Sequence, residues 1–205
     1  MIQDLIKKHD GSRFQAELSK FIFDHNLKTI VETGMGVSSI FILNGFDLMS
    51  SGSKEHHLIS IDPSAWFEDR FDHPNHTLIE KKSVDAMLDT YYQYGPWDCF
   101  LHDGDHEILC QTYEYAFAYD CLKPGGYLFS DDTNWNNNGA WDKFCQDKGL
   151  KMFKLGDTFG VQKPLESSFC PSSEASRRHE TYLAIATKAE EEWLAAGGIK
   201  HPAFR

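Results

Sequence analysis

The sequence lacks the features that mark membrane-spanning, secreted and nucleic-acid-binding proteins. No apolar run exceeds five residues, the length of 115–119, whereas a membrane-spanning helix needs about 20. The first nine residues contain no apolar core of the kind found in a secretory signal. The 20 Lys and Arg residues are outnumbered by 31 Asp and Glu, and the net charge of −11 disfavours a phosphate backbone as partner. We therefore expect neither a membrane partner nor a nucleic-acid partner.

The cysteines lack the spacing of a disulfide or zinc framework. Five of them lie at positions 99, 110, 121, 145 and 170, and no two form a C-x-x-C motif. An odd number of scattered cysteines predicts free thiols in a reducing compartment. The length of 205 residues suits one domain with a small extension. We therefore expect an acidic, cytoplasmic protein.

What the sequence does contain is an alternation of short apolar strands and amphipathic helices, which predicts an α/β fold with a parallel sheet. Helices are predicted over 12–25, through 40–43 and 109–117, and over 182–193. Strands are predicted over 29–32, 57–62, 77–80, 97–103 and 127–131, followed by an antiparallel hairpin of 150–154 and 158–162. The helix through 109–117 is expected to stop at Lys123-Pro-Gly-Gly126.

The chain changes character near residue 165. Residues 1–165 are predicted to form the main domain, with a helical lead-in over 1–27, and residues 166–205 a mostly helical extension. The segment 166–176 is rich in Ser and Glu, and Cys170-Pro171 is expected to interrupt any regular element. The helix that follows is interpreted as a solvated helix with one apolar stripe, or as a contact with the core or with another subunit of a homo-oligomer.

A glycine-containing loop joins the first predicted strand to a helix. Glycines at 34 and 36 allow a sharp turn and the close approach of a ligand, although a plain tight turn is the alternative. A dinucleotide-binding loop has a third glycine where this chain has Ser39, and the carboxylate of Glu32 would repel a pyrophosphate. Glu32 instead suits an ammonium or sulfonium ligand, and Asp62, which ends the next strand, suits the two hydroxyls of a ribose.

Acidic side chains follow two further strands of the predicted sheet. Asp103 lies in the segment His102-Asp-Gly-Asp-His-Glu107, and Asp131-Asp132 ends the fifth strand. Because neighbouring strands lie about 4.8 Å apart, these carboxylates can converge on one point. Oxygen ligands with open positions suit Mg²⁺, Mn²⁺ or Ca²⁺. The alternative is that Asp105, Asp131 and Asp132 cap helices.

Together these motifs resemble the class I S-adenosylmethionine-dependent methyltransferases, and most of all the group with macrolide-sugar O-methyltransferases and cephalosporin-hydroxylase-type proteins. The resemblance covers about residues 28–163 and rests on 32–39, 61–62, 98–106, 124–126 and 131–132, in that order. It implies a Rossmann-like, seven-stranded, mostly parallel sheet with helices on both faces and a C-terminal antiparallel hairpin. It also implies methylation of a small-molecule hydroxyl by S-adenosylmethionine, assisted by a divalent metal, Mg²⁺.

The resemblance assigns roles to individual residues. Those implied to bind the cofactor are Glu32, Thr33, Gly34, Gly36, Ser38, Ser39, Asp62, Ser83, Val84 and Asp103, with Ser83 and Val84 near the adenine. The implied metal ligands are Asp103, Asp131 and Asp132, and the implied catalytic residues are Asp103 and the general base His106. Ser38 stands where many such loops have a third glycine. His106 as a surface histidine near a helix start is the alternative, and His102 is expected to point to the opposite strand face and to be structural.

Two other functions are considered. An NAD(P)-linked oxidoreductase would use a Tyr-x-x-x-Lys pair, and Tyr119 and Lys123 have that spacing, but they fall where a helix is expected to end. A non-catalytic nucleoside-binding protein of the same fold is the other possibility. Binding of S-adenosylhomocysteine or of NADH separates the first of these from a methyltransferase.

Overall fold

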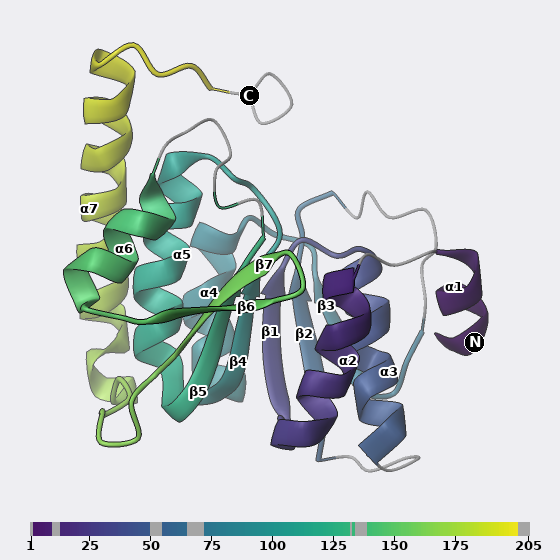
Figure 1. Cartoon of the computed structure of the whole chain (residues 1–205). Coiled ribbons are helices and arrows are strands. Elements are labelled where there is room, and N and C mark those ends of the chain that lie inside the picture. The colour runs from purple at the N-terminus through teal and green to yellow at the C-terminus, as the bar shows by residue number, and fades with distance from the viewer. Residues whose placement is uncertain are drawn as a thin grey trace.

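A computed structural model describes residues 2–9, 13–49, 55–64, 72–131, 133 and 139–200 (Figure 1). Its strands are β1 (Thr29–Thr33), β2 (His57–Ile61), β3 (His76–Ile79), β4 (Trp97–His102), β5 (Leu122–Ser130), β6 (Met152–Leu155) and β7 (Thr158–Gln162). They form one seven-stranded sheet in the order β3-β2-β1-β4-β5-β7-β6. Strands β1 to β5 are parallel, and β7 is antiparallel to both β5 and β6. The predicted Rossmann-like sheet with its antiparallel end is confirmed.

Helices cover both faces of this sheet. They are α1 (Ile2–Lys8), α2 (Arg13–His25), α3 (Val37–Met49), α4 (Ser83–Tyr94), α5 (Ile108–Cys121), α6 (Ala140–Lys148) and α7 (Ser172–Ala195). Figure 1 shows α2 and α3 on one side of the strands and α4 and α5 on the other. The outermost helix, α7, packs against α5 and α4.

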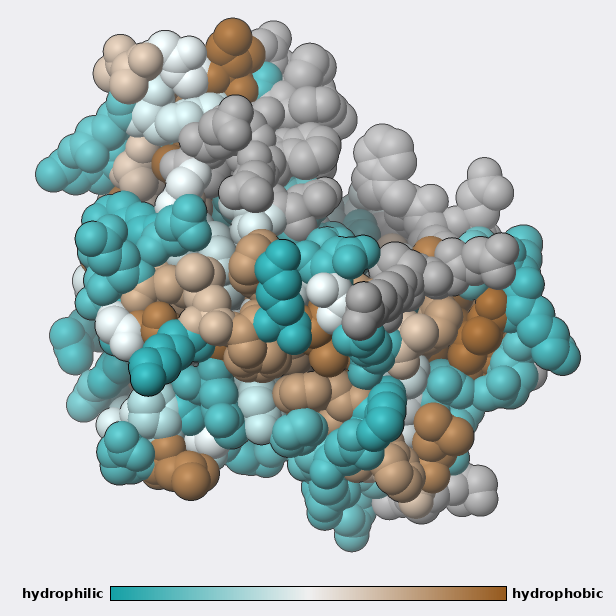
Figure 2. Space-filling model, in the orientation of Figure 1, coloured by the Kyte–Doolittle hydropathy of each residue, from teal (hydrophilic) through white to brown (hydrophobic). Residues whose placement is uncertain are grey.

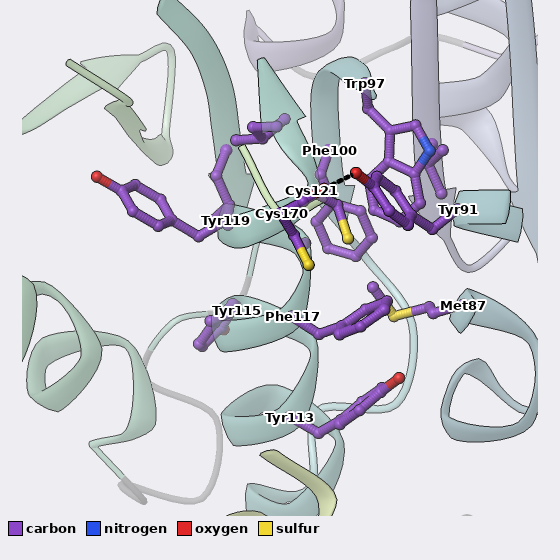
Figure 3. Close-up of a cluster of buried hydrophobic side chains, with 14 of the residues drawn as sticks. Met87, Tyr91, Trp97, Phe100, Tyr113, Tyr115, Phe117, Tyr119, Cys121 and Cys170 are labelled. Atoms are coloured by element: carbon purple, nitrogen blue, oxygen red, sulfur yellow. Dashed lines mark hydrogen bonds between the residues drawn. The ribbon is translucent and has the colours of Figure 1, made fainter. Parts of the chain in front are cut away.

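Each face of the sheet has its own hydrophobic core. One core contains Phe14, Leu18, Ile22, Ile30, Ile40, Leu43, Leu101 and Phe129; the other contains Val31, Met87, Phe100, Tyr113, Phe117 and Leu128. Ile30 and Val31 are neighbours on β1 but belong to opposite cores, because successive side chains of a strand point to opposite faces. Figure 3 shows the second core, where side chains of α4 and α5 lie against Trp97 and Phe100 of β4.

The C-terminal helix is tied to the body by polar contacts as well as by packing. The carboxylate of Asp120, at the end of α5, accepts hydrogen bonds from Arg178 and from the hydroxyl of Tyr182. The hydroxyl of Tyr91 donates to the carbonyl of Cys170, just before α7 (Figure 3). These contacts fix α7 on α5 and α4, whereas the predicted division of the chain at residue 165 stays a prediction.

The observed elements differ from the predicted ones in three ways. Strand β5 begins at Leu122, so Lys123-Pro-Gly-Gly126 lies within its bounds, and the pairing with β4 shifts between Trp97 and Cys99. Helix α7 begins at Ser172, directly after Cys170-Pro171 and ten residues before the predicted helix over 182–193. Helices α4 and α6 were not predicted, whereas α1 lies within the predicted helical lead-in over 1–27. The proposed start of the first helix at Ser12 lies outside the described residues.

The cysteines are free thiols, as their spacing predicts, and the visible surface mixes hydrophilic and hydrophobic residues. All five cysteines are free, and burial raises the pKa of Cys145 to about 12. On the face seen in Figure 2, hydrophobic residues form several separate patches among hydrophilic ones. In the part of the chain that the structure describes, no helix is both long and apolar enough to span a bilayer.

A buried lysine donates hydrogen bonds to backbone carbonyls at the carboxyl end of α5. Removing its ammonium group should destabilise the fold. Lys163 is 2% exposed, and its Nζ donates to the carbonyls of Tyr119 (2.8 Å), Asp120 (3.2 Å) and Leu122 (2.9 Å). Lys163→Met keeps a side chain of similar length but removes the donor that these three carbonyls share; the Asp120 carbonyl keeps its hydrogen bond from the backbone nitrogen of Cys170. We expect a loss of about 2–4 kcal/mol in the free energy of unfolding, measured with urea.

The control is Lys143→Met on α6. Its ammonium pairs with Asp147 at 2.9 Å, but its side chain is 74% exposed. The expected change is below about 0.5 kcal/mol. Equal effects of the two substitutions would contradict the assigned role of Lys163.

Candidate functional site

The loops that follow β1 and β4 meet at the carboxyl edge of the sheet. The chain leaves β1 for β2 on one side and, after β3, returns to β4 on the other side. In open α/β sheets, ligands bind at such a change of direction. The register places Thr33 opposite both Ile61 and His102, so the three strands end together. The residues after these strands therefore lie at one edge.

Glycines allow the two loops to touch. Gly34 has φ +83°, and a Cβ at this position would lie 2.1 Å from the carbonyl oxygen of Asp103. A Cβ on Gly104 would lie 3.1 Å from the backbone nitrogen of Gly34. At Gly36, by contrast, a Cβ would meet no atom of the described residues within 4 Å. Gly34 is thus required by the protein itself, whereas Gly36 faces open space through which a ligand can approach the backbone.

Glu32 lies beneath the glycine loop and not on its surface. Its side chain is fully buried and accepts hydrogen bonds from Ser60 (2.5 Å) and from Ser39 in the first turn of α3. Burial raises the pKa of Glu32 to about 8, the serine hydroxyls oppose this rise, and the charge of Asp103 adds to it. Glu32 is therefore mostly neutral at pH 7, which corrects the expectation of a carboxylate charge presented to a ligand. Its contact with a cofactor stays a prediction.

Asp62 holds the glycine loop against the end of β2. One carboxylate oxygen accepts from the backbone nitrogen of Met35 at 2.9 Å, and the other accepts from that of Ser64 at 2.8 Å. The side chain is only 6% exposed. Ser83 is buried at the start of α4, and the next residue, Val84, packs against the core. The predicted ribose contact of Asp62 and adenine contacts of Ser83 and Val84 remain predictions.

Two of the three predicted metal ligands follow adjacent strands. The backbone nitrogen of Asp131 donates to the carbonyl of His102, directly before Asp103. Ser38 Oγ lies 3.0 Å from Asp103 Oδ2, and Thr158 Oγ1 lies 3.2 Å from Asp131 Oδ1, so a hydroxyl positions each carboxylate.

The third predicted metal ligand, Asp132, lies outside the described residues. Among the residues that are described, no group of three or more His, Cys, Asp and Glu side chains is arranged to hold a metal ion. Of the three predicted metal ligands, the structure therefore describes Asp103 and Asp131, which follow adjacent strands.

A chain of buried polar side chains lies behind the Asp103 loop. Thr33 Oγ1 donates to Glu114 Oε2 at 2.7 Å, His102 Nδ1 lies 2.6 Å from the same oxygen, and His102 Nε2 lies 3.1 Å from His106 Nδ1. All four side chains are at least nine-tenths buried. Burial, helped by the charge of His102, lowers the pKa of His106 to about 3. His106 is therefore a buried, neutral ring at pH 7 and not a surface histidine.

This chain changes the interpretation of three residues. His102 contacts His106 directly, so it is not isolated from the predicted base by its position on the strand. The hydroxyl of Thr33 is directed to Glu114, and its predicted cofactor contact stays a prediction. Glu114 itself was missed, although it is a lone carboxylate directly before the apolar run 115–119.

The Tyr-x-x-x-Lys pair lies at the wrong edge of the sheet for the oxidoreductase alternative. Tyr119 lies in the last turn of α5, with its ring centroid 5.3 Å from Lys163 Nζ, and Lys123 forms an ion pair with Asp98 at 2.7 Å. Both flank the amino-terminal end of β5, while the glycine loop is at the carboxyl edge. The two residues therefore do not belong to the site described above.

Comparison with known proteins identifies relatives of this arrangement. The sequence model of the family described as "Methyltransferase domain" matches residues 31–133, which contain the glycine loop, the acidic strand ends and the buried histidines. No curated protein sequence gives a significant match.

Several solved structures share the fold. MycE methyltransferase from the mycinamycin biosynthetic pathway, in complex with Mg and S-adenosylhomocysteine (SAH), has a TM-score of 0.54 and 14% identity over 76% of this chain and 50% of that one. An O-methyltransferase from Bacillus cereus with SAH has a TM-score of 0.54 and 16% identity over 76% and 83%. TomG of Streptomyces achromogenes, an O-methyltransferase of tomaymycin synthesis solved with S-adenosylmethionine, has a TM-score of 0.55 and 15% identity over 73% and 78%. The chain thus spans about half the length of MycE.

The raised pKa of Glu32 predicts a pH-dependent stability. A folded pKa of about 8, compared with an ordinary value of 4.5, means that the unfolded chain loses this proton first as the pH rises. The stability of the wild type should fall between about pH 4.5 and pH 8, by about 3–5 kcal/mol from this group. Glu32→Gln removes the ionisable group. The free energy of unfolding of this variant, relative to that of the wild type, should therefore rise between about pH 4.5 and pH 8. Urea unfolding at pH 5, 6.5 and 8 measures this; parallel pH profiles would contradict it.

Proposed function

The chain belongs to the methyltransferase-domain family, the class I S-adenosylmethionine-dependent methyltransferases, and from that premise we propose that it methylates a hydroxyl oxygen of a small molecule with the help of a divalent cation. One observation carries the proposal: at the change of direction of the sheet the glycine loop lies against the backbone of Asp103, whose carboxylate is 3.0 Å from Ser38 Oγ, and the backbone nitrogen of Asp131 donates to the carbonyl of His102, directly before Asp103. The relatives named as O-methyltransferases, and the Mg in the MycE complex, support the same chemistry.

The residues at the loop fit S-adenosylmethionine. The open space beside Gly36 admits a ligand against the backbone. Asp62 already accepts hydrogen bonds from Met35 and Ser64, and a carboxylate with about four lone-pair positions can also accept from ribose hydroxyls. When bound, S-adenosylmethionine supplies a methyl group on a sulfonium sulfur, which leaves as a neutral thioether.

The acidic strand ends fit a hard cation. Mg²⁺ in proteins is held by one or two carboxylates together with waters and substrate oxygens. Asp103 and Asp131 would supply two carboxylates, each oriented by a hydroxyl, and Asp132 is proposed as the third ligand. A divalent cation held here would orient a substrate hydroxyl and lower its pKa.

His106 is proposed to take the proton of that hydroxyl. A neutral imidazole has one nitrogen without a proton, which can accept one. Asp103 belongs to the same loop, three residues earlier, so one short segment would position the substrate oxygen and remove its proton. The methyl acceptor is a neutral or cationic small molecule, since the protein is acidic.

Calorimetry tests the cofactor assignment. We expect saturable binding of SAH and none of NADH. Gly36→Ala should reduce the SAH affinity at least tenfold while leaving the thermal unfolding temperature unchanged, because the added Cβ meets only the space proposed for the ligand. In Gly34→Ala the fold itself should be destabilised, since the Cβ would overlap the Asp103 carbonyl. Binding of NADH without SAH would contradict the proposed function.

The cation assignment is tested separately. Asp103→Asn and Asp131→Asn should each weaken the binding of Mn²⁺, used as a spectroscopic probe for Mg²⁺, at least tenfold, because each removes one charged ligand. Asp147→Asn on the exposed side of α6 is the control and should bind Mn²⁺ as the wild type does. Unchanged affinity in both site variants would remove the cation from the proposal and leave the SAH site standing.

A further inference from the structure

A cavity lies at the amino-terminal edge of the sheet, opposite the edge that carries the glycine loop. Its volume is about 200 Å³, and it lies between the end of α2 and the start of β5, at the lower edge of the sheet in Figure 1. Residues 25–27, Asp98 and 123–127 line it. We propose that this cavity binds a small carboxylate with a flat apolar body, held by Lys123 and by the hydroxyl of Tyr127. The inference does not rest on the proposed function.

Asp98 fixes the ammonium group of Lys123 at this cavity. The Nζ of Lys123 lies 2.7 Å from Asp98 Oδ1. The other oxygen, Oδ2, accepts hydrogen bonds from the backbone nitrogens of Lys28 (3.2 Å) and Thr29 (2.8 Å), so backbone donors already balance part of the carboxylate charge. Among the described residues the ammonium donates to Asp98 alone, which leaves two of its three N–H donors for a ligand.

The hydroxyl of Tyr127 is a second donor in the cavity wall. Tyr127 is 9% exposed, and its hydroxyl oxygen accepts a hydrogen bond from Gln162 Nε2 at 3.0 Å. The hydrogen of this hydroxyl has no acceptor in the part of the chain that the structure describes. Burial raises the pKa of Tyr127 above its ordinary value, so the hydroxyl keeps this hydrogen at pH 7. A few donors placed in this way fix the orientation of a ligand in a small pocket.

The unused hydrogen-bonding groups favour a ligand that supplies acceptors. The donors of Lys123 and Tyr127 need acceptor atoms, and a carboxylate has two oxygens with about four lone-pair positions. Hydrogen bonds between an ammonium and a carboxylate are stronger than those between neutral groups. A cationic ligand would instead compete with Lys123 for Asp98, whose two oxygens already accept three hydrogen bonds.

The remaining walls fit a flat apolar body. The ring of His25 stacks on Phe21 with centroids 3.9 Å apart, and it meets the ring of Tyr127 edge-on at 5.1 Å. Leu27 and Pro124 add aliphatic surface. Pockets for drug-sized ligands measure about 300–1,000 Å³, so this smaller cavity suits a molecule of about one ring.

The segment Lys123-Pro-Gly-Gly126 shapes the cavity because glycine lets two backbones meet. A Cβ on Gly126 would lie 2.9 Å from the carbonyl oxygen of Lys123 and 3.0 Å from that of Asp98. A larger residue at Gly126 would therefore push apart the two residues that form the ion pair. This gives a function to a segment that the sequence marks only as the end of a helix.

Fluorine-19 NMR with 4-fluorobenzoate as the probe tests the inference. We expect saturable binding to the wild type, weakened about tenfold or more in Lys123→Gln, which loses the ammonium group. Tyr127→Phe keeps the ring and loses only the hydroxyl, and should weaken binding about threefold or more. The absence of saturable binding to the wild type would overturn the inference, and so would unchanged affinity in both variants.

The matched control is Lys28→Gln, directly before β1 at the same edge of the sheet. The ammonium of Lys28 pairs with Glu55 at 2.7 Å and its side chain is 41% exposed, compared with 2.7 Å and 39% for Lys123, but Lys28 does not line the cavity. Its affinity for 4-fluorobenzoate should equal that of the wild type. A loss as large as that in Lys123→Gln would indicate a general effect of net charge and would overturn the inference.

Two further titrations test the charge of the ligand and the location of its site. 4-Fluorobenzamide has nearly the same shape without the charge and should bind about tenfold more weakly or less; equal binding would overturn the assignment of a carboxylate. Saturating SAH should not displace 4-fluorobenzoate, because the glycine loop lies at the opposite edge of the sheet. Displacement by SAH would overturn the location, whereas a failure of SAH to bind at all would contradict the proposed function alone.

Discussion

The contact between two backbone loops at Gly34 and Asp103 is the constraint on which the rest of the site depends. A side chain at Gly34 would overlap the Asp103 carbonyl, so the loop after β1 can lie against the loop after β4 only with glycine there. This approach places Asp103 within hydrogen-bonding distance of Ser38, on the first turn of α3. The glycine loop and the acidic loop are therefore one structural unit.

Two buried glutamates form hydrogen bonds to residues of the strands and helices that carry these loops. Glu32 and Glu114 differ in how their buried carboxyl groups are stabilised. Glu32 is surrounded by serine hydroxyls, and burial raises its pKa so far that it is mostly neutral at pH 7. Glu114 is paired with an imidazole and a threonine hydroxyl. An isolated buried carboxylate is costly, and both solutions reduce that cost: the first by protonation and the second by hydrogen bonds from His102 and Thr33. Only the second arrangement reaches a residue that can take part in proton transfer.

The strands and the acidic strand ends could be predicted from the sequence. Helix α4, the start of β5 and the contact between His102 and Glu114 could not, for physical reasons. The strands were found because they are short apolar runs that end in turn residues or carboxylates. Helix α4 was missed although Val84, Met87, Leu88 and Tyr91 have helical spacing, and β5 was shortened because Pro124 and two glycines usually mark a break. The proximity of Asp103 and Asp131 followed from strand spacing alone. The link from His102 to Glu114 did not, because it depends on which face of α5 packs against the sheet.

The proposed function therefore requires a ligand site at the carboxyl ends of β1 and β4. A crystal structure of the protein with SAH tests this most directly. We expect the homocysteine portion to lie against the backbone at Gly36, and the ribose hydroxyls to lie within hydrogen-bonding distance of Asp62. SAH bound elsewhere, for example at the amino-terminal edge of the sheet beside Asp98 and Lys123, would contradict it.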